Sequence, residues 1–341
     1  MSTSTVSSTS IGTSSSIIST TSIAASSSIS SSTAPSTSSV GYVTTTQQYT
    51  GLVATTTTIP PSGTVSGTVI IRTPLPTFSC DPNGYLVQRN GSAYSLSRVN
   101  IPTGNREFIR QGVGTGAAIN AMGYNSLDNY LYAALGSTPG NLLRIGSNGD
   151  SQTLASLGLT TAVTSGDVDE NGYYWATAGG KQWWQYDVRP GSATFGQLVT
   201  SGTANPGMTI LLTDWAYAPN PSLTGANVNC CLYAIAYDDP LAVGLLQFNT
   251  YLLQFNRTTK AWAQVRSFGA IKTNVGGLLG KAAWGALYAA TDGFLYCTET
   301  GSGEIWRFPL AAGAAAPTSG LSKGPASSND DGARCITAGA V

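Results

Sequence analysis

The chain has 341 residues, with sixteen basic side chains, sixteen acidic side chains and no histidine. Zero net charge without a basic cluster argues against a nucleic-acid partner, and the lack of histidine excludes Ser-His-Asp and Cys-His catalysis and argues against zinc. No apolar run approaches the roughly 20 residues that a membrane span requires.

The first 40 residues contain 27 Ser or Thr residues, and no charged side chain occurs before Arg72. Such a segment cannot bury enough apolar surface to offset the entropy of ordering. We therefore expect residues 1–40 to be a disordered Ser/Thr-rich stalk, which would carry O-linked sugars if the protein is secreted. The alternative is an unmodified disordered tail.

Residues 41–77 are rich in Thr and Pro, including residues 55–58 and Ile59-Pro60-Pro61. β-Branched residues and prolines favour an extended chain. The pattern resembles the Thr-rich repeats of fungal flocculins and agglutinin-like cell-wall adhesins, which implies a cell-wall location.

From Phe78 onward the pattern becomes one strand every 8 to 12 residues, with Gly, Asn, Asp or Pro between strands. This spacing is typical of an all-β domain, here residues 78–341. Four strands can be assigned to one repeat at residues 118–124, 130–135, 142–146 and 152–157. The next repeat gives 163–168, 173–178, 183–188 and 195–200.

An aromatic pair on one strand and an Arg/Gln-apolar-Asn/Asp triplet on the next recur along the domain. The Arg or Gln positions are Arg98, Arg144, Gln185, Gln254 and Arg307, which are 46, 41, 69 and 53 residues apart. The shorter spacings match a four-stranded propeller blade. We therefore expect a β-propeller of five blades, with six as the alternative, and insertions at residues 220–225 and 240–248.

A propeller closes its ring by pairing the two ends of the domain in one blade. The first repeat lacks an inner strand, and residues 332–337 form an unassigned strand near the end of the sequence. Pairing them would bring Cys80 near Cys335, and a disulfide there would lock the ring. For the other cysteines, a Cys231–Cys297 bond and a vicinal Cys230–Cys231 bond both remain open.

The region from Cys80 to Cys335 resembles an uncharacterised repeat domain of fungal and bacterial surface proteins. The resemblance is carried by residues 119–125, Gly166-Asp167-Val168-Asp169, residues 213–217 and residues 324–332. It implies a repeat fold and a surface location, and it carries no catalytic residues.

The run from Asp167 to Gly172 resembles the opening of a calcium loop, with Asp167, Asp169 and Asn171 as oxygen ligands. Position twelve of such a loop, normally Glu, is Ala178. The same residues also suit an ordinary hairpin turn, which we take as the default, with calcium as the alternative.

Polar residues recur at comparable points of the inner strands, and tryptophans could supply platforms for sugars. If the polar groups face the central channel, they would suit a cation or a polyol; otherwise they hydrogen-bond backbone groups between blades. The Trp side chains have packing between blades as their alternative role. The candidate ligand-binding residues are Asn120, Asp167, Asp214, Trp215, Trp284, Asn329, Asp330 and Asp331.

Two N-glycosylation sequons, at Asn90 and Asn256, fall at predicted turns and favour secretion. No signal peptide is visible, so a secreted protein would be expected to have further sequence at its N-terminus.

These features predict a secreted or cell-wall surface protein whose propeller is an adhesin-like module for binding or display. Its expected partner is a surface carbohydrate or a protein. We expect a monomer without a membrane span, without a nucleic-acid partner and without a required cofactor. The alternative is an extracellular hydrolase or lyase that uses channel carboxylates and a divalent cation.

Overall fold

The computed structural model describes residues 43–47, 55–59, 74–204, 210–238, 249–271, 283–313, 320–324, 326 and 329–341. The predicted stalk at residues 1–40, most of residues 41–77 and the apolar insert at residues 240–248 lie outside these ranges. Strands β1 (Val43–Gln47) and β2 (Thr55–Ile59) form an antiparallel pair.

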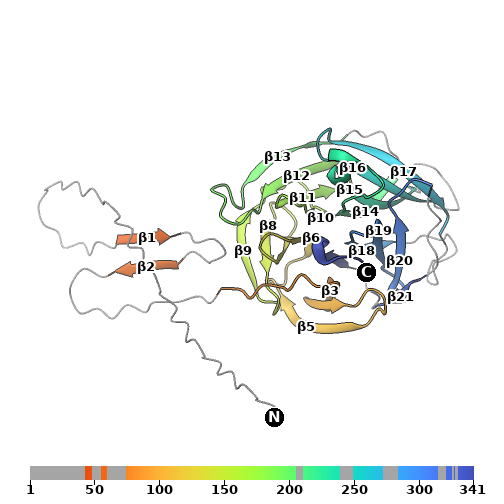
Figure 1. Ribbon diagram of the computed structural model, residues 1–341. Helices are drawn as coiled ribbons and strands as arrows, with labels where there is room; N and C mark the ends of the chain where they lie inside the picture. Colours follow the sequence, from red (N-terminus) through yellow and green to blue (C-terminus); the bar gives the residue numbers. More distant parts are fainter. Residues whose placement is uncertain are drawn as a thin grey trace, which may run out of the picture.

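Five antiparallel sheets of four strands each form a β-propeller, which confirms the predicted fold class and the favoured blade number (Figure 1). Blade 1 combines β22 (Asp330–Arg334) with β3 (Gly84–Asn90), β4 (Ala93–Val99) and β5 (Arg106–Val113). Blade 2 contains β6 (Ile119–Asn125), β7 (Tyr130–Leu135), β8 (Asn141–Ile145) and β9 (Ser151–Ser156). Blade 3 contains β10 (Ser165–Val168), β11 (Tyr173–Ala178), β12 (Gln182–Asp187) and β13 (Leu198–Thr203).

Blades 4 and 5 follow the same order from the centre outward. Blade 4 contains β14 (Ile210–Tyr217), β15 (Cys231–Asp238), β16 (Thr250–Asn256) and β17 (Ala261–Gly269), with the short 3-10 helix η1 (Gly225–Asn229) between β14 and β15. Blade 5 contains β18 (Trp284–Ala289), β19 (Phe294–Glu299), β20 (Glu304–Pro309) and β21 (Ser322–Lys323). No helix in the described part of the chain is long and apolar enough to cross a membrane.

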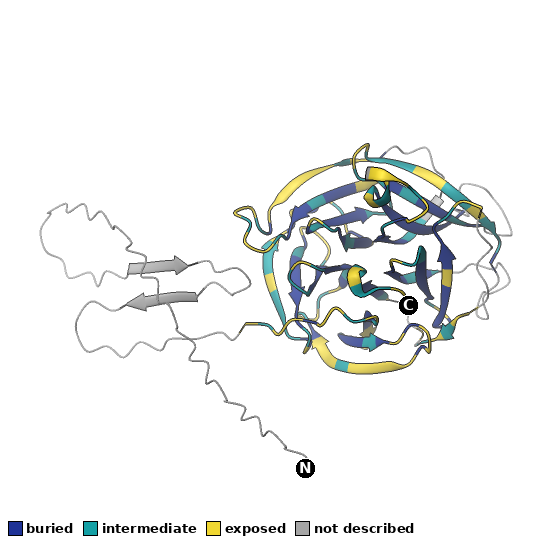
Figure 2. Ribbon diagram, in the orientation of Figure 1, coloured by how far each residue is buried: buried dark blue, intermediate teal, exposed yellow. Residues whose placement is uncertain are grey.

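The hydrophobic core lies between the blades, in one cluster for each of the five interfaces. Successive side chains of a strand point to opposite faces, so each second strand supplies two neighbouring interfaces. In β7, Leu131 packs between blades 1 and 2, whereas Tyr130 and Tyr132 pack between blades 2 and 3. The recurring aromatic pair of the sequence is therefore a packing element of the second strand. Figure 2 shows the inner strands mostly buried and the outermost strands exposed or intermediate.

Glycines allow the inner strands of neighbouring blades to approach closely. A Cβ atom on Gly123 of β6 would lie 2.5 Å from the backbone nitrogen of Val168 in β10. A Cβ on Gly332 of β22 would lie 2.7 Å from the Cβ of Ala286 in β18. Glycine is required at these points because a side chain would collide with the neighbouring blade.

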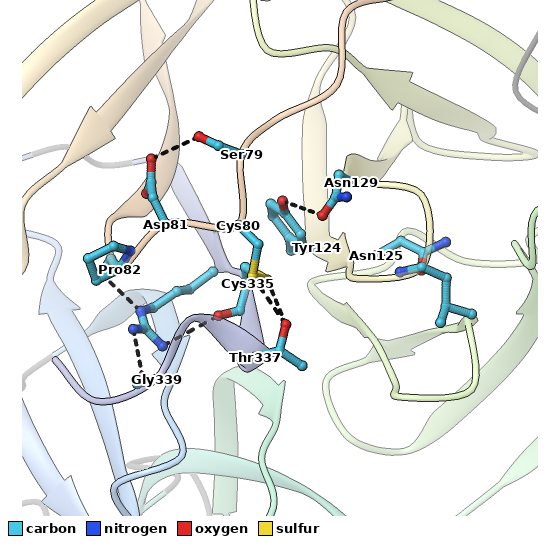
Figure 3. Close-up of a disulfide and its surroundings, with 12 residues drawn as sticks. Ser79, Cys80, Asp81, Pro82, Tyr124, Asn125, Asn129, Cys335, Thr337 and Gly339 are labelled. Atoms are coloured by element: carbon cyan, nitrogen blue, oxygen red, sulfur yellow. Dashed lines mark hydrogen bonds between the residues drawn. A yellow bond between two sulfur atoms is a disulfide. The ribbon is translucent and has the colours of Figure 1, made fainter. Parts of the chain in front are cut away.

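The ring closes in blade 1, where β22 pairs with β3 in register from Asp330↔Gln88 to Arg334↔Gly84. The predicted disulfide Cys80–Cys335 is present and spans 255 residues (Figure 3). Arg334 reinforces the closure because its guanidinium donates hydrogen bonds to the backbone oxygens of Pro82, Ala289 and Gly339. These bonds connect the closing strand to Pro82, which precedes β3, and to Ala289 at the end of β18 in blade 5.

Candidate functional site

Four carboxylates on the inner strands form what we call the axial acidic cluster: Asp167 of β10, Asp214 of β14, and Asp330 and Asp331 of β22. The negative charges of Asp331 and Asp167 both act on Asp214, and that of Asp330 acts on Asp331. The structure therefore brings these four predicted residues together around the centre of the ring.

Asp167 joins neighbouring blades through backbone hydrogen bonds. Its Oδ2 accepts a bond of 2.8 Å from the backbone nitrogen of Tyr217 in β14, and the backbone N–H of Tyr124 in β6 also stabilises its ionised form. Its Oδ1 accepts a bond from the nitrogen of Val168. Burial of the carboxyl group outweighs these donors and raises the pKa of Asp167 to about 8.

Asp331 and Asp214 are more deeply buried, at 1% and 2% exposure. Asp331 Oδ2 accepts a 3.0 Å bond from the backbone nitrogen of Met122 in β6, and Asp214 Oδ1 accepts a 2.7 Å bond from the nitrogen of Trp215. The backbone N–H of Leu287 in β18 also stabilises the ionised form of Asp214, and those of Ala121 and Gly332 stabilise that of Asp331. Burial raises the pKa of both groups well above the ordinary range, and the charge of Asp331 adds to the rise at Asp214.

Asp330 is partly buried beside blade 5. Its Oδ1 occupies the space that a side chain on Gly285 would need, since a Cβ there would lie 2.0 Å away. Burial is the main cause that raises the pKa of Asp330 to about 7, and the charge of Glu299 adds to it. Its Oδ2 has no hydrogen-bond partner in the described structure.

The two predicted amide residues differ in position, because Asn120 makes the same bond to the next backbone nitrogen as Asp167 and Asp214, whereas Asn329 lies just before β22. Asn120 of β6 uses its Oδ1 to accept a 2.9 Å bond from the backbone nitrogen of Ala121. Asn329 is exposed just before β22, and its backbone oxygen accepts a bond from the nitrogen of Arg89. Asn329 therefore lies at the corner where the ring closes.

The two predicted tryptophans are buried between blades. Trp215 is 1% exposed and packs against Phe255 and Trp262, with ring centroids 5.5 and 5.9 Å apart. Trp284 is 0% exposed and packs against Trp306 and Phe308. Neither ring presents a face to solvent.

In the turn predicted as a hairpin, with a calcium loop as the alternative, the oxygens of Asp169 accept hydrogen bonds from protein donors. Asp169 Oδ1 accepts bonds of 3.0 Å from the backbone nitrogens of Asn171 and Tyr173, which is the pattern of a side-chain-stabilised turn. Its Oδ2 accepts bonds from Trp175 Nε1 at 2.8 Å and from Arg257. Asp167, by contrast, bonds to the inner strands. Among the described residues no group of three or more Asp, Glu, Cys or His side chains is arranged to hold a metal.

A basic and aromatic group around this turn, the Arg257 cluster, was not foreseen from the sequence. Arg257, in the β16–β17 turn, pairs with Asp169 and with Glu170 at 2.9 Å, and also donates to the backbone oxygen of Asn229. Its guanidinium lies 4.9 Å from the ring centroid of Tyr217. The cluster joins blades 3 and 4. Only the Asn256-Arg257-Thr258 turn signal marks it in the sequence, and it does not indicate a partner 88 residues away.

Lys260 lies in the same β16–β17 turn as Arg257, and its ammonium lies over two indole rings of blade 3. The distances to the ring centroids are 4.3 Å for Trp175 and 4.9 Å for Trp183. Burial lowers the pKa of Lys260, and the charge of Arg257 contributes in the same direction. These contacts are cation–π interactions that use the aromatic side chains for cohesion.

The remaining cysteines settle the two alternatives left open by the sequence. Cys230 and Cys231 form a vicinal disulfide, and Cys297 is a free, buried thiol whose pKa is raised by burial. The two sequons differ in exposure. Asn90 is exposed at the tip of the β3–β4 hairpin, whereas Asn256 is partly buried and its Oδ1 accepts bonds from the nitrogens of Thr258 and Thr259.

The segment that follows β22 lies over one end of the ring's centre, where Figure 1 marks the C-terminus. The 3-10 helix η2 (Ile336–Ala338) begins just after Cys335. Ile336 packs against the clusters between blades 3 and 4 and between blades 4 and 5, Ala338 packs between blades 1 and 2, and Val341 packs between blades 5 and 1. This segment therefore contacts most of the blade interfaces at that end.

Comparison with protein families identifies the family to which the repeat domain belongs. The model of the family described as "Repeat of unknown function (DUF6923)" matches residues 85–337, which run from β3 to η2. The chain belongs to this family. The matched region of the DUF6923 repeat includes all five blades and the closing strand, so the family is a match to the whole propeller. The chain matches no curated protein in sequence.

Solved structures with similar folds share little sequence with this DUF6923 repeat. "Streptogramin B lyase structure" is 10% identical with a TM-score of 0.37, over 71% of this chain and 75% of that one. "Crystal structure of Nidogen/Laminin Complex" is 11% identical with a TM-score of 0.41, over 70% and 80%. A functionally unknown protein from Desulfotomaculum acetoxidans DSM 771 is 8% identical with a TM-score of 0.38, over 72% and 67%. Likenesses at this level carry no argument about function.

Proposed function

We propose that the chain is a secreted or cell-wall surface protein whose propeller serves as a non-catalytic module for binding or display. The Cys80–Cys335 disulfide, which links the two ends of the ring, is the observation that carries this proposal. Together with the vicinal Cys230–Cys231 bond, it favours an oxidising compartment, where disulfides form and persist. The Ser/Thr-rich sequence before the propeller would act as the stalk.

The use of the polar residues favours binding or display over catalysis. Asp167 and Asp331 direct carboxylate oxygens to backbone N–H groups of neighbouring blades, which is a structural role. The chain contains no histidine to serve as a general base or nucleophile activator. Trp215 and Trp284 support the blade interfaces.

The surface that best suits a ligand is the ring-closure corner, which we define as Asn329 and Asp330 with Arg89 beside them. Asn329 and Arg89 are exposed, whereas Asp330 is only partly exposed and its Oδ2 is buried. Amide, carboxylate and guanidinium groups can hydrogen-bond the hydroxyl groups of a carbohydrate or the polar groups of a protein surface. We therefore place the carbohydrate or protein ligand at this corner.

A glycan array with the purified full chain tests this placement. We expect binding to a subset of glycans that is lost in Asn329→Ala and in Asp330→Asn. Asp150→Asn, at a half-exposed surface aspartate on the β8–β9 turn, should bind as the wild type does. Flat binding would reject the carbohydrate ligand, and equal binding by all variants would reject the corner as its location.

A second candidate function is an extracellular hydrolase or lyase, and Asp330 is the observation that favours it. Burial raises the pKa of Asp330 to about 7, and a carboxyl group with such a pKa is suited to donate a proton near neutral pH. Turnover of a polysaccharide or ester panel by the wild type that is lost in Asp330→Asn would show that the chain is an enzyme rather than a binding module. Absence of turnover in the wild type would leave the binding module as the proposal.

A further inference from the structure

The two cysteines of the ring-closing disulfide differ in their access to solvent. Cys80 is exposed in the segment before β3, whereas Cys335, directly after β22, is completely buried (Figure 3). Thiol–disulfide exchange begins when a thiolate attacks one of the two sulfurs, and its rate depends on access to that sulfur. An external thiol therefore meets this bond at Cys80, and the sulfur that leaves is that of Cys335.

A hydroxyl group lies beside both sulfurs. Thr337 Oγ1, in η2, is 3.1 Å from Cys80 Sγ and 3.3 Å from Cys335 Sγ, and dashed lines mark these contacts in Figure 3. A thiolate that forms at a buried position requires a hydrogen-bond donor, because burial disfavours the charged form. The hydroxyl of Thr337 can donate to Cys335 Sγ as the S–S bond breaks, so its position supports the departure of this sulfur.

The charges near Cys80 are balanced, which permits the approach of an anionic thiolate. The neighbouring carboxylate, Asp81, forms an ion pair of 2.9 Å with Arg98. The guanidinium of Arg334 donates hydrogen bonds to the backbone oxygens of Pro82 and Cys335. A positive charge therefore lies next to the backbone of the leaving cysteine.

We propose that Cys80 is a modification site for low-molecular-weight thiols, which exchange with the ring-closing disulfide. The thiolate forms a bond to Cys80 Sγ, the Cys80–Cys335 bond breaks, and its electron pair stays on Cys335 Sγ, which takes up a proton from water. The products are a mixed disulfide at Cys80 and a free thiol at Cys335. Once deprotonated, Cys335 reverses the step by attacking Cys80 Sγ and expelling the thiol, so no other oxidant or reductant is required.

Exchange at Cys80 changes how the ring is held, which exchange at the vicinal disulfide does not. The Cys230–Cys231 bond joins adjacent residues, so breaking it separates no strands. Exchange at Cys80 removes the covalent link at the closing strand and leaves the β22–β3 pairing, from Asp330↔Gln88 to Arg334↔Gly84, without it. The thiols around the protein would therefore set how firmly the ring is closed. This role is independent of any ligand at the ring-closure corner.

Reaction of the folded full chain with reduced glutathione tests the site. Rapid alkylation stops the reaction, and peptide mass mapping locates the glutathione adduct. We expect at least about tenfold more adduct on Cys80 than on Cys335, with Cys335 alkylated in the modified molecules. The rate should rise in proportion to the glutathione concentration and exceed the rate of global unfolding, and the modified protein should melt at a lower temperature.

Variants of Thr337 test the role of its hydroxyl group. Thr337→Val should slow the exchange roughly threefold to tenfold, and Thr337→Ser should restore the rate. A loss of packing alone would expose the disulfide and speed the reaction, so slower exchange separates the two roles. Thr200→Val, at an exposed threonine of β13, is the matched control and should react as the wild type does.

The vicinal disulfide is removed in Cys230→Ala/Cys231→Ala, in which the same adduct on Cys80 should form. If this variant does not fold, mapping of the wild type still decides the question, because the cysteines lie in different peptides. Two results would overturn the proposal. The first is exchange no faster than global unfolding and independent of glutathione concentration, which would show that the folded protein protects the bond. The second is as much adduct on Cys335 as on Cys80.

Discussion

Gly123 lies where the inner strand of blade 2 meets that of blade 3. A Cβ atom there would be 2.5 Å from the nitrogen of Val168 and 2.6 Å from the Cα of Asp167. Both are backbone atoms, so no side-chain rotation can relieve the collision. We expect Gly123→Ala to lower the free energy of unfolding by about 3 kcal/mol, measured by denaturant titration.

Gly320 provides the matched control, because the nearest atom to a Cβ there is 3.8 Å away. Gly320→Ala should therefore change the free energy of unfolding by less than about 0.5 kcal/mol. Equal effects of the two substitutions would show that the inner strands are not as closely packed as described.

Asp167 makes stability depend on pH in a direction that can be worked out. Its pKa is about 8 in the folded protein and about 4 in an unfolded chain, so the folded state binds more protons between these values. The contribution of Asp167 is full below about pH 4 and is lost as the pH rises through about 8. We expect the melting temperature to fall over this range, with a smaller fall in Asp167→Asn.

The asparagine at position 167 keeps an oxygen that can accept the N–H of Tyr217, so the variant separates charge from hydrogen bonding. Asp150→Asn, whose carboxylate pairs with Arg110 on the surface, should retain the wild-type dependence on pH. A steeper fall in Asp167→Asn than in the wild type would contradict the sign of the pKa shift.

At the scale of single residues, the sequence indicates which positions carry polar side chains better than it indicates which groups those side chains contact. Asn120, Asp167 and Asp214 stand out because they recur at comparable points of the inner strands, and Asp330 and Asp331 because they lie near the ring closure. The backbone donors that Asp214 and Asp331 meet in neighbouring blades depend on how the five inner strands approach one another, which no spacing along the chain specifies. For the same reason, the burial of Trp215 between blades could be weighed against exposure but not decided.

At the scale of elements, period-two alternation and turn chemistry predict the strands closely. Residues 130–135 and 173–178 are β7 and β11 as expected, whereas β13 begins three residues after the predicted residue 195. The delay arises because Asp187 accepts hydrogen bonds from Ser192 and Thr194, which hold residues 192–197 in a compact connection before β13. Side-chain bonds of this kind leave no periodic signal.

The Arg257 cluster joins two turns of neighbouring blades, and its removal should loosen both. Asp169 is 2% exposed, so Arg257→Ala would leave a buried carboxylate without its cation. We expect a loss of about 3 kcal/mol in the free energy of unfolding. Arg257→Lys keeps the charge and should lose less, although one ammonium cannot reproduce the bonds to Asp169, Glu170 and Asn229.

Hydrogen exchange adds a local readout for this pair of variants. Faster exchange at the amides of Asn171 and Tyr173 in Arg257→Ala would show that the β10–β11 turn opens. Unchanged exchange there, with the stability loss confined to blade 4, would contradict the link between the two turns.

At the scale of the whole molecule, the Cys80–Cys335 disulfide spans the entire propeller. Cross-linking positions 255 residues apart removes much of the entropy of the unfolded chain. We expect the Cys80→Ala/Cys335→Ala double variant to lose about 4 kcal/mol of unfolding free energy in denaturant titration. The Cys230→Ala/Cys231→Ala pair is the control, since that bond joins adjacent residues and closes no long loop.

The blade number and the closing strand followed from spacing and from one unassigned strand, because a ring must pair its ends somewhere. Cys80 and Cys335 lie at the seam, which is the place in blade 1 where the two ends of the propeller pair. The described structure and the assignment of repeats agree on this place. The vicinal Cys230–Cys231 bond could not be chosen in the same way. Cys231 and Cys297 lie on equivalent strands of successive repeats, β15 and β19, so the sequence left Cys230 and Cys297 both open as partners of Cys231.

The seam also sets an order of events during synthesis. A ribosome releases β3, β4 and β5 early, but β22 emerges only after the other four blades have been translated. Until then β3 exposes an unpaired edge and Cys80 has no nearby partner thiol. Each of the later blades can assemble as it appears, whereas blade 1 must wait for release of the last strand. Retention of the nascent chain by chaperones should therefore depend on blade 1, which is translated first and completed last.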